Sequence, residues 1–259
     1  MKCPKLQTYV PPKTNRLTCF ITDRLPGFVN LLFWLVFLAG ILAGNAWERS
    51  ERNDMAKPTD RRTRTNDPEG MRQKLLDVAE EKFQAQGYHA TSLGDLMQAA
   101  SVTGGALHHH FPTKKALGLA VINERVAAAV AETWIRPVEG ALSARQGVRQ
   151  VFAGVADQLE RQGFVRGCPL NNLAHELSLA DPEFRAALAR IFADWQAAIA
   201  DRIRADQHSG VEDRQTDPDR FAALAVATYS GAMSMAKTVQ NAAVLRSCAV
   251  SFDPTGRGG

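Results

Sequence analysis

The stretch "AASVTGGALHHHFPTKKAL", residues 99–117, decides the fold of this chain and raises the first question about its function. Its three consecutive histidines could form a metal site, a catalytic cluster or a surface that contacts a partner. On a helix, adjacent residues point about 100° apart, so His108, His109 and His110 cannot all turn to one metal ion. A general base needs an oriented partner and a pocket, and the sequence indicates neither. We therefore expect no metal site and no catalytic residue in this stretch.

Two amphipathic segments precede the histidines. Apolar residues recur at steps of three and four from Met71 onward, and Gly87 ends this first helix. A second, shorter helix begins at Ser92, which can form a weak capping box with Asp95. The turn "SVTGG" leads to a third helix, "GGALHHHF", which Pro112 ends. Two short helices joined by a tight turn predict a helix-turn-helix.

The run "KLLDVAEEKFQAQGYHATSLGDLMQAASVTGGALHHHFPTKKAL" resembles the N-terminal DNA-binding domain of TetR-family transcriptional regulators. The most specific pieces are "FQAQGYHATS", "AASVTGGALHHHF" and "FPTKKAL". Two positions depart from the family pattern: Ser101 stands where a turn glycine is usual, and His108 stands where a tyrosine is usual. A serine adopts a left-handed conformation only at some cost, so we expect a slightly strained turn.

The resemblance implies an all-α protein, in which a three-helix helix-turn-helix domain precedes a helical effector-binding and dimerisation domain. It implies a regulator, most often a repressor, that binds a palindromic DNA operator as a homodimer and is released by a small-molecule effector. Whether regulation is negative stays open. The chain has no P-loop, dinucleotide-binding, nucleophile-elbow or zinc-protease motif, so we expect neither an enzyme nor a cofactor.

Ten residues are the predicted DNA contacts. Small residues let the start of the third helix approach the major groove, and hydroxyls and lysines can meet phosphates. The resemblance implies that His108 and His109 lie on the side of this helix that meets DNA. The hydroxyls could instead serve only as helix caps, and the histidines could be a solvated face without a ligand. The predicted contacts are Thr91, Ser92, Thr103, Gly104, Gly105, Ala106, His108, His109, Lys114 and Lys115.

The domain prediction begins with a leader, residues 1–54, whose uncharged run at 28–44 is at the short limit for spanning a bilayer. The leader could be upstream sequence with the true start at Met55, a membrane anchor, or a signal peptide, and a DNA-binding domain argues against export. We predict a disordered basic arm at 55–70, the helix-turn-helix domain at 71–117, the ligand-binding and dimerisation domain at 118–250, and a disordered tail at 251–259. Four scattered cysteines favour a cytoplasmic location, or inner-membrane anchoring if the leader is translated. A membrane-anchored helical sensor is the rival function.

Helical segments alone follow residue 117. We expect one from Lys114 to Trp134 that ends before Pro137, one over 143–162, one in "GCPLNNLAHELSLA", and two opened by the Asp-Pro pairs at 181–182 and 217–218. The alanine-rich stretch 221–245 permits close helix packing. By resemblance it belongs to a four-helix dimer interface, although it could be the core helix of a monomer.

The middle helices would enclose an effector pocket, unless the same residues simply fill a core. Cys168 lies between Arg166 and a helix start at Pro169, where a thiolate would be favoured, so a redox- or electrophile-responsive repressor is an alternative. The competing interpretation of Cys168 is a small buried residue. The predicted ligand-binding residues are Phe152, Phe164, Cys168, Asn172, His175 and Trp195.

Overall fold

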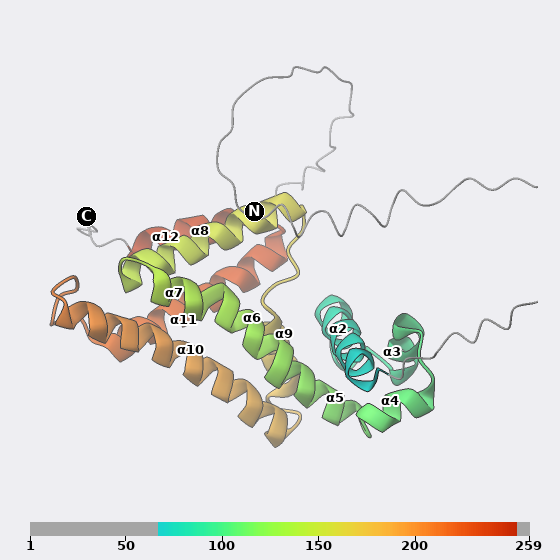
Figure 1. The fold of residues 1–259 in the computed structure, drawn as a ribbon. Helices are drawn as coiled ribbons and strands as arrows, with labels where there is room; N and C mark the ends of the chain where they lie inside the picture. The colour runs from blue at the N-terminus through green and yellow to red at the C-terminus, as the bar shows by residue number, and fades with distance from the viewer. Residues whose placement is uncertain (1–66, 253–259) are drawn as a thin grey trace, which may run out of the picture. The chain divides into compact units, whose positions relative to one another are not determined.

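A computed structural model describes residues 67–252 of the 259-residue chain (Figure 1). The leader, its apolar run at 28–44 and residues 55–66 of the predicted arm lie outside the described residues. Within 67–252 the regular elements are all helical, which confirms the predicted fold class. No helix of this part of the chain is long and apolar enough to cross a membrane.

The first three helices, α2 (Pro68–Gln86), α3 (Leu93–Ala100) and α4 (Gly104–His110), form the predicted helix-turn-helix domain. The carboxylate of Asp67 accepts a hydrogen bond from the Gly70 N–H at 2.9 Å, and Pro68 occupies the first turn of α2. A capped proline of this kind starts a helix readily. The prediction that residues 68–70 belong to a disordered arm is therefore wrong.

Capping side chains also set the start of the next two helices. At α3, the Ser92 hydroxyl accepts from the Asp95 N–H at 3.0 Å, and the Asp95 carboxylate accepts from the Ser92 N–H at 2.8 Å. At α4, the Thr103 hydroxyl accepts from the Ala106 N–H at 3.3 Å. The capping box that the sequence predicted for α3 is confirmed.

One continuous helical stretch runs from Lys114 to Gly140 as α5 (Lys114–Ala120), α6 (Ala127–Val130) and α7 (Arg136–Gly140), joined by π-helical turns at 121–126 and 131–135. The prediction that this helix ends before Pro137 is wrong. The Arg136 N–H bonds to the Ala131 carbonyl, five residues back, so the backbone is already widened where the proline enters. A π-type turn accommodates the ring and the missing N–H of a proline better than a regular α-helical turn does.

The remaining helices are α8 (Ala144–Gln162), α9 (Pro169–Leu177), α10 (Pro182–His208), α11 (Pro218–Val239) and α12 (Ala243–Ala249), as Figure 1 shows. Asp181 and Asp217 cap α10 and α11 as their Asp-Pro pairs predicted. The alanine-rich stretch 221–245 is two helices, because Gln240 adopts a left-handed conformation with φ 52°. Its side-chain amide bonds both the N–H and the carbonyl of Val165, at 3.0 Å each, which holds the break in place.

The C-terminal residues Ser251 and Phe252 do not belong to the predicted disordered tail. A short 3-10 turn at Val250–Phe252 brings the Phe252 ring into the core, where it is 1% exposed. The ring lies 5.6 Å from that of Phe152 and 5.7 Å from that of Phe221. Burial of an aromatic side chain offsets the entropy cost of ordering this segment.

Candidate functional site

The turn between α3 and α4 carries the strain that the sequence predicted. Ser101 adopts a left-handed conformation with φ 53°, and its N–H bonds to the Gln98 carbonyl at 3.1 Å. The next N–H, of Val102, bonds to the Met97 carbonyl at 3.0 Å. These two bonds end α3 within one residue. Chain direction therefore changes sharply, and α4 projects its far side to solvent.

The far side of α4 is open. Gly105 has no atom within 4 Å of the position that a side-chain carbon would take, and Thr103 is exposed. His108 and His109 are exposed as well, with the His108 Nδ1 lying 3.3 Å from the Pro112 carbonyl oxygen. The opposite side is anchored in the core by the buried residues Leu96, Ala100, Leu107 and Phe111.

The predicted contact residues also include Ser92, Gly104 and Ala106. Ser92 is exposed at the start of α3, whereas Gly104 and Ala106 are half-buried along α4. The side chain of Ser92 is already used as a cap. Ser92 and the residues at the start of α4, Thr103 and Gly105, are exposed, so the backbone at these two helix starts is accessible from solvent.

Thr91 is the predicted DNA contact that the structure contradicts most clearly. Its side chain is fully buried, and its hydroxyl donates to the Gly87 carbonyl at 2.7 Å. A hydroxyl spent in this way is not available to a phosphate. Its role is to fix the loop between α2 and α3.

The two predicted phosphate-binding lysines have different surroundings. The Lys114 ammonium lies 4.3 Å from the centre of the Tyr88 ring and donates to the His89 carbonyl at 3.4 Å, and partial burial lowers its pKa. Lys115 instead pairs with Asp181 and Glu183 of the helical domain, at 2.7 Å each. Lys115 therefore joins the two domains, and the prediction that it offers a free charge to phosphate is wrong.

A second interdomain contact is made by Glu176, near the end of α9. Its carboxylate accepts hydrogen bonds from the backbone N–H groups of Tyr88 and His89, the former at 2.8 Å. The same carboxylate lies 3.1 Å from the position that a side-chain carbon would take on Gly87, whose φ is +91°. Glycine is required here by both the conformation and the close approach.

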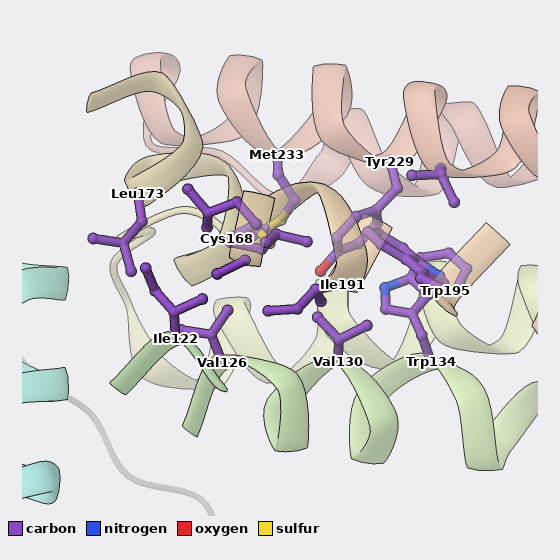
Figure 2. Close-up of a cluster of buried hydrophobic side chains, with 14 of the residues drawn as sticks. Ile122, Val126, Val130, Trp134, Cys168, Leu173, Ile191, Trp195, Tyr229 and Met233 are labelled. Atoms are coloured by element: carbon purple, nitrogen blue, oxygen red, sulfur yellow. The ribbon is translucent and has the colours of Figure 1, made fainter. Parts of the chain in front are cut away.

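The helical domain contains an aromatic cavity of about 50 Å³. Figure 2 shows Trp134 and Trp195 beside Tyr229, with Cys168 further along the same cluster. The rings pack tightly, since the Trp134 centroid lies 4.8 Å from that of Trp195 and 4.7 Å from that of Tyr229. The cavity is lined by Val126, Ala129, Val130, Thr133, Trp134, Cys168, Pro169, Leu170, Trp195 and Tyr229.

An outer hollow of about 270 Å³ adjoins this aromatic cavity. Thr133, Cys168, Pro169 and Tyr229 line both spaces. Phe164 lies in the outer hollow with 45% of its side chain exposed. The two spaces are therefore neighbours, separated by side chains that line both.

The six predicted ligand-binding residues lie in four different places. Cys168 and Trp195 line the aromatic cavity, and Phe164 lines only the outer hollow. Phe152 is fully buried and packs against Trp134 and Tyr229 as core. The prediction was wrong for Asn172 and His175, which line a separate hollow between α2 and α9. Sequence reasoning missed Trp134 and Tyr229 as lining residues, although each is a large aromatic side chain in an alanine-rich stretch.

Cys168 does not have the environment predicted for a thiolate. Burial raises the pKa of its thiol, and the helix start at Pro169 offsets only part of this through backbone hydrogen bonds. The Arg166 guanidinium lies over the Phe164 ring, 4.9 Å from its centre, rather than beside the sulfur. The prediction of a lowered pKa was wrong, because desolvation outweighs the favourable backbone groups.

The described residues hold no cluster of histidine, cysteine or acidic side chains that could bind a metal ion. What they do hold is a helix-turn-helix with an exposed second helix, followed by a helical domain with an internal cavity. This combination defines a helix-turn-helix DNA-binding protein.

Comparison with known families identifies both parts. The family described as "Bacterial regulatory proteins, tetR family" matches residues 75–121, and "Transcriptional regulator LmrA/YxaF-like, C-terminal domain" matches residues 144–251. The chain belongs to the TetR family of bacterial transcriptional regulators. It is a DNA-binding regulator and not an enzyme.

Individual relatives agree with this assignment. Transcriptional regulator AcuR of Cereibacter sphaeroides is 30% identical over 169 residues, which cover 64% of this chain and 75% of that protein. HTH-type transcriptional repressor DhaR of a Mycobacterium species is 27% identical over 178 residues, covering 66% and 84%. The solved structure of a regulatory protein TetR from Rhodobacter sphaeroides superimposes with a TM-score of 0.63 at 29% identity, covering 70% of this chain and 95% of that one.

Proposed function

We propose that this protein is a repressor that binds a palindromic operator as a homodimer and releases it when a small effector enters the aromatic cavity. The observation that carries the proposal is the position of α9. Its first residues lie beside Cys168 at the cavity, and Glu176 near its other end holds the loop before the recognition helices. A ligand that displaces α9 would therefore move the DNA-binding domain.

The DNA contacts proposed for this chain are those of the open side of α4. Gly105 and Ala106 let the helix backbone enter the major groove, and His108 and His109 face the base edges. Lys114, held over the Tyr88 ring, supplies charge to a phosphate. One short helix reads only a few base pairs, so a two-fold pair of protomers reading two half-sites is needed for a specific operator.

The proposed dimer surface lies on α10 and α11. Both helices bury one face in the domain core and expose a row of small or apolar residues on the other face. Small residues allow helices of two protomers to approach closely, and membership of the family implies dimerisation. The exposed row consists of Ala189, Ala193 and Ala197 on α10 and Ala223, Leu224, Ala227, Gly231 and Met235 on α11.

Repression is supported by a relative, DhaR, which is described as a transcriptional repressor. The rival function, a membrane-anchored sensor, depends on residues 1–54, which lie outside the described residues. The thiol-based alternative has less support, since burial raises the pKa of Cys168. A transcriptional regulator that binds the operator would act in the cytoplasm, where the DNA is.

The proposal is tested with the full chain and a palindromic duplex selected from a random pool. If the dimer neutralises about 6 phosphates, the slope of log K against log salt should be near −5. His109→Ala should change which duplexes are preferred, whereas Lys114→Ala should weaken binding to all duplexes alike. A slope near zero, or binding by a strict monomer, would contradict the proposal.

A further inference from the structure

The aromatic cavity contains two buried donors that the fold leaves unused. Trp134 and Trp195 are 2% and 0% exposed, and neither indole N–H has a hydrogen-bond partner within the described part of the chain. Among residues 67–252, these two indole nitrogens are the buried side-chain nitrogen or oxygen atoms that lack a hydrogen-bond partner. A buried N–H without a partner costs free energy, so its retention calls for an explanation.

Both unpaired indoles line one cavity rather than separate parts of the core. Figure 2 shows the two rings side by side, with Trp134 carried by the helical stretch 114–140 and Trp195 by α10. A volume of about 50 Å³ leaves room for about four water-sized atoms. Both tryptophans border this space.

The walls of the cavity exclude a charged occupant. None of the side chains that line it is an acid or a base, and its polar groups besides the indoles are Thr133, Cys168 and Tyr229. Burial raises the pKa of Tyr229 well above its ordinary value, and burial also raises that of Cys168, so both groups are neutral. The Trp134 N–H lies near the Tyr229 phenol without forming a proper hydrogen bond, and it offsets part of that rise. A buried ion would have no partner here.

We propose that the aromatic cavity binds a small uncharged ligand through a carbonyl-type oxygen, which accepts hydrogen bonds from the indole N–H groups of Trp134 and Trp195. The apolar body of the ligand packs against Val126, Val130 and Leu170. It enters through the outer hollow, which shares four lining residues with the cavity. This inference rests on the proposed effector pocket and specifies the chemical class of its ligand.

The test follows the indole N–H resonances of the full chain, labelled with 15N at tryptophan. The chain has four tryptophans, and Trp34 and Trp47 serve as internal references. Trp134→Phe and Trp195→Phe assign the two cavity resonances and remove one donor each while keeping an aromatic ring. Three probes of similar size are titrated in the absence of DNA: butan-2-one, cyclopentane and butylammonium.

Butan-2-one should move both cavity resonances downfield and saturably, and it should bind about tenfold more tightly than cyclopentane, the difference expected of one or two hydrogen bonds. Each Trp→Phe variant removes one of the two donors and should lower this preference, measured as the ratio of its affinities for butan-2-one and cyclopentane. If a variant does not fold, the comparison of the probes on the unmodified chain still decides.

Equal binding of butan-2-one and cyclopentane, or cavity resonances that butan-2-one leaves in place, would overturn the inference and identify an apolar or hydrated cavity. Tight binding of butylammonium would overturn the requirement for an uncharged ligand. None of these measurements involves DNA, so a failure here leaves operator binding standing. Loss of operator binding, in contrast, would refute the proposed function without touching the indole resonances.

Discussion

The Glu176 carboxylate accepts a hydrogen bond from the backbone N–H of Tyr88 at 2.8 Å, and this bond connects the helical domain to the loop that opens the recognition unit. Tyr88 itself packs edge-on against Phe184 of α10, with ring centres 5.1 Å apart. The loop 87–90 is thus held by α9 through the hydrogen bonds to the Glu176 carboxylate, and by α10 through the ring contact with Phe184. A movement of either helix on ligand binding would reach the helix-turn-helix.

Removal of the Glu176 carboxylate should loosen this loop. In Glu176→Ala the amides of Tyr88 and His89 should exchange with solvent about tenfold to a hundredfold faster, because a hydrogen bond to a charged group contributes about 1.5 to 3 kcal/mol. Hydrogen exchange followed by NMR gives the measurement. His175→Ala is the matched control, since His175 is exposed on the same helix and should leave both amides unchanged. Unchanged exchange in Glu176→Ala would remove the coupling route.

Ser101→Gly should stabilise the protein. A left-handed conformation costs an L-residue about 1 to 2 kcal/mol, of which a glycine recovers part after its larger entropy loss on folding. We expect a gain of about 0.5 to 1 kcal/mol in the free energy of unfolding, measured by denaturant titration. Gln240→Gly is the informative contrast, because Gln240 is also left-handed but its side chain bonds Val165. A destabilised Ser101→Gly would mean that the serine makes a contribution beyond conformation.

The sequence predicted the parts of the fold that local chemistry decides. The Asp-Pro starts of α10 and α11 and the capping box of α3 were correct, since each depends on residues within one turn. Two of the wrong predictions involved contacts between distant segments. Lys115 pairs with Asp181, and Phe252 is ordered by Phe152, and local patterns do not show such partners.

The candidate pocket shows the same limit. Cys168 and Trp195 were expected at the pocket and lie there, but the predicted thiolate chemistry ignored the desolvation that only packing reveals. Trp134 and Tyr229 come from helices that are far apart in the sequence, so their meeting follows from tertiary structure alone.

Phe252→Ala should show that the end of the described chain is structural. Deleting a fully buried aromatic side chain costs about 3 to 5 kcal/mol, and Phe252 is 1% exposed. Thermal and denaturant unfolding of the variant gives this value. The neighbouring Val250→Ala is the control, because 69% of Val250 is exposed and surface changes usually stay within about 0.5 kcal/mol. Similar losses in both variants would contradict the anchoring role.

Gly231→Arg should separate the proposed dimer without unfolding the protomer. Gly231 is exposed on α11 and has no atom within 4 Å of the position that a side-chain carbon would take, so one protomer accommodates the arginine. Two opposed arginines would repel and keep the helices apart. Sedimentation should give a monomer with an unchanged circular dichroism spectrum. Gly154→Arg on α8 is equally unhindered and should leave the dimer intact, and loss of the dimer in that variant would locate the interface elsewhere.

Cys168 should resist alkylation in the folded protein. Burial raises the pKa of its thiol, so the reactive thiolate is scarce at neutral pH, and the reagent also lacks access. Iodoacetamide at pH 7, followed by peptide mass spectrometry, should modify the partly exposed Cys248 first, whereas both cysteines should react at similar rates in guanidinium. The raised pKa also means that the folded state holds this proton more tightly than the unfolded state does. The thiol therefore contributes fully to the free energy of unfolding below the ordinary thiol pKa, and this contribution falls as the pH rises through the pKa of the folded state. Cys168→Ser should abolish this loss. Faster modification of Cys168 than of Cys248 would restore the thiol-sensing alternative.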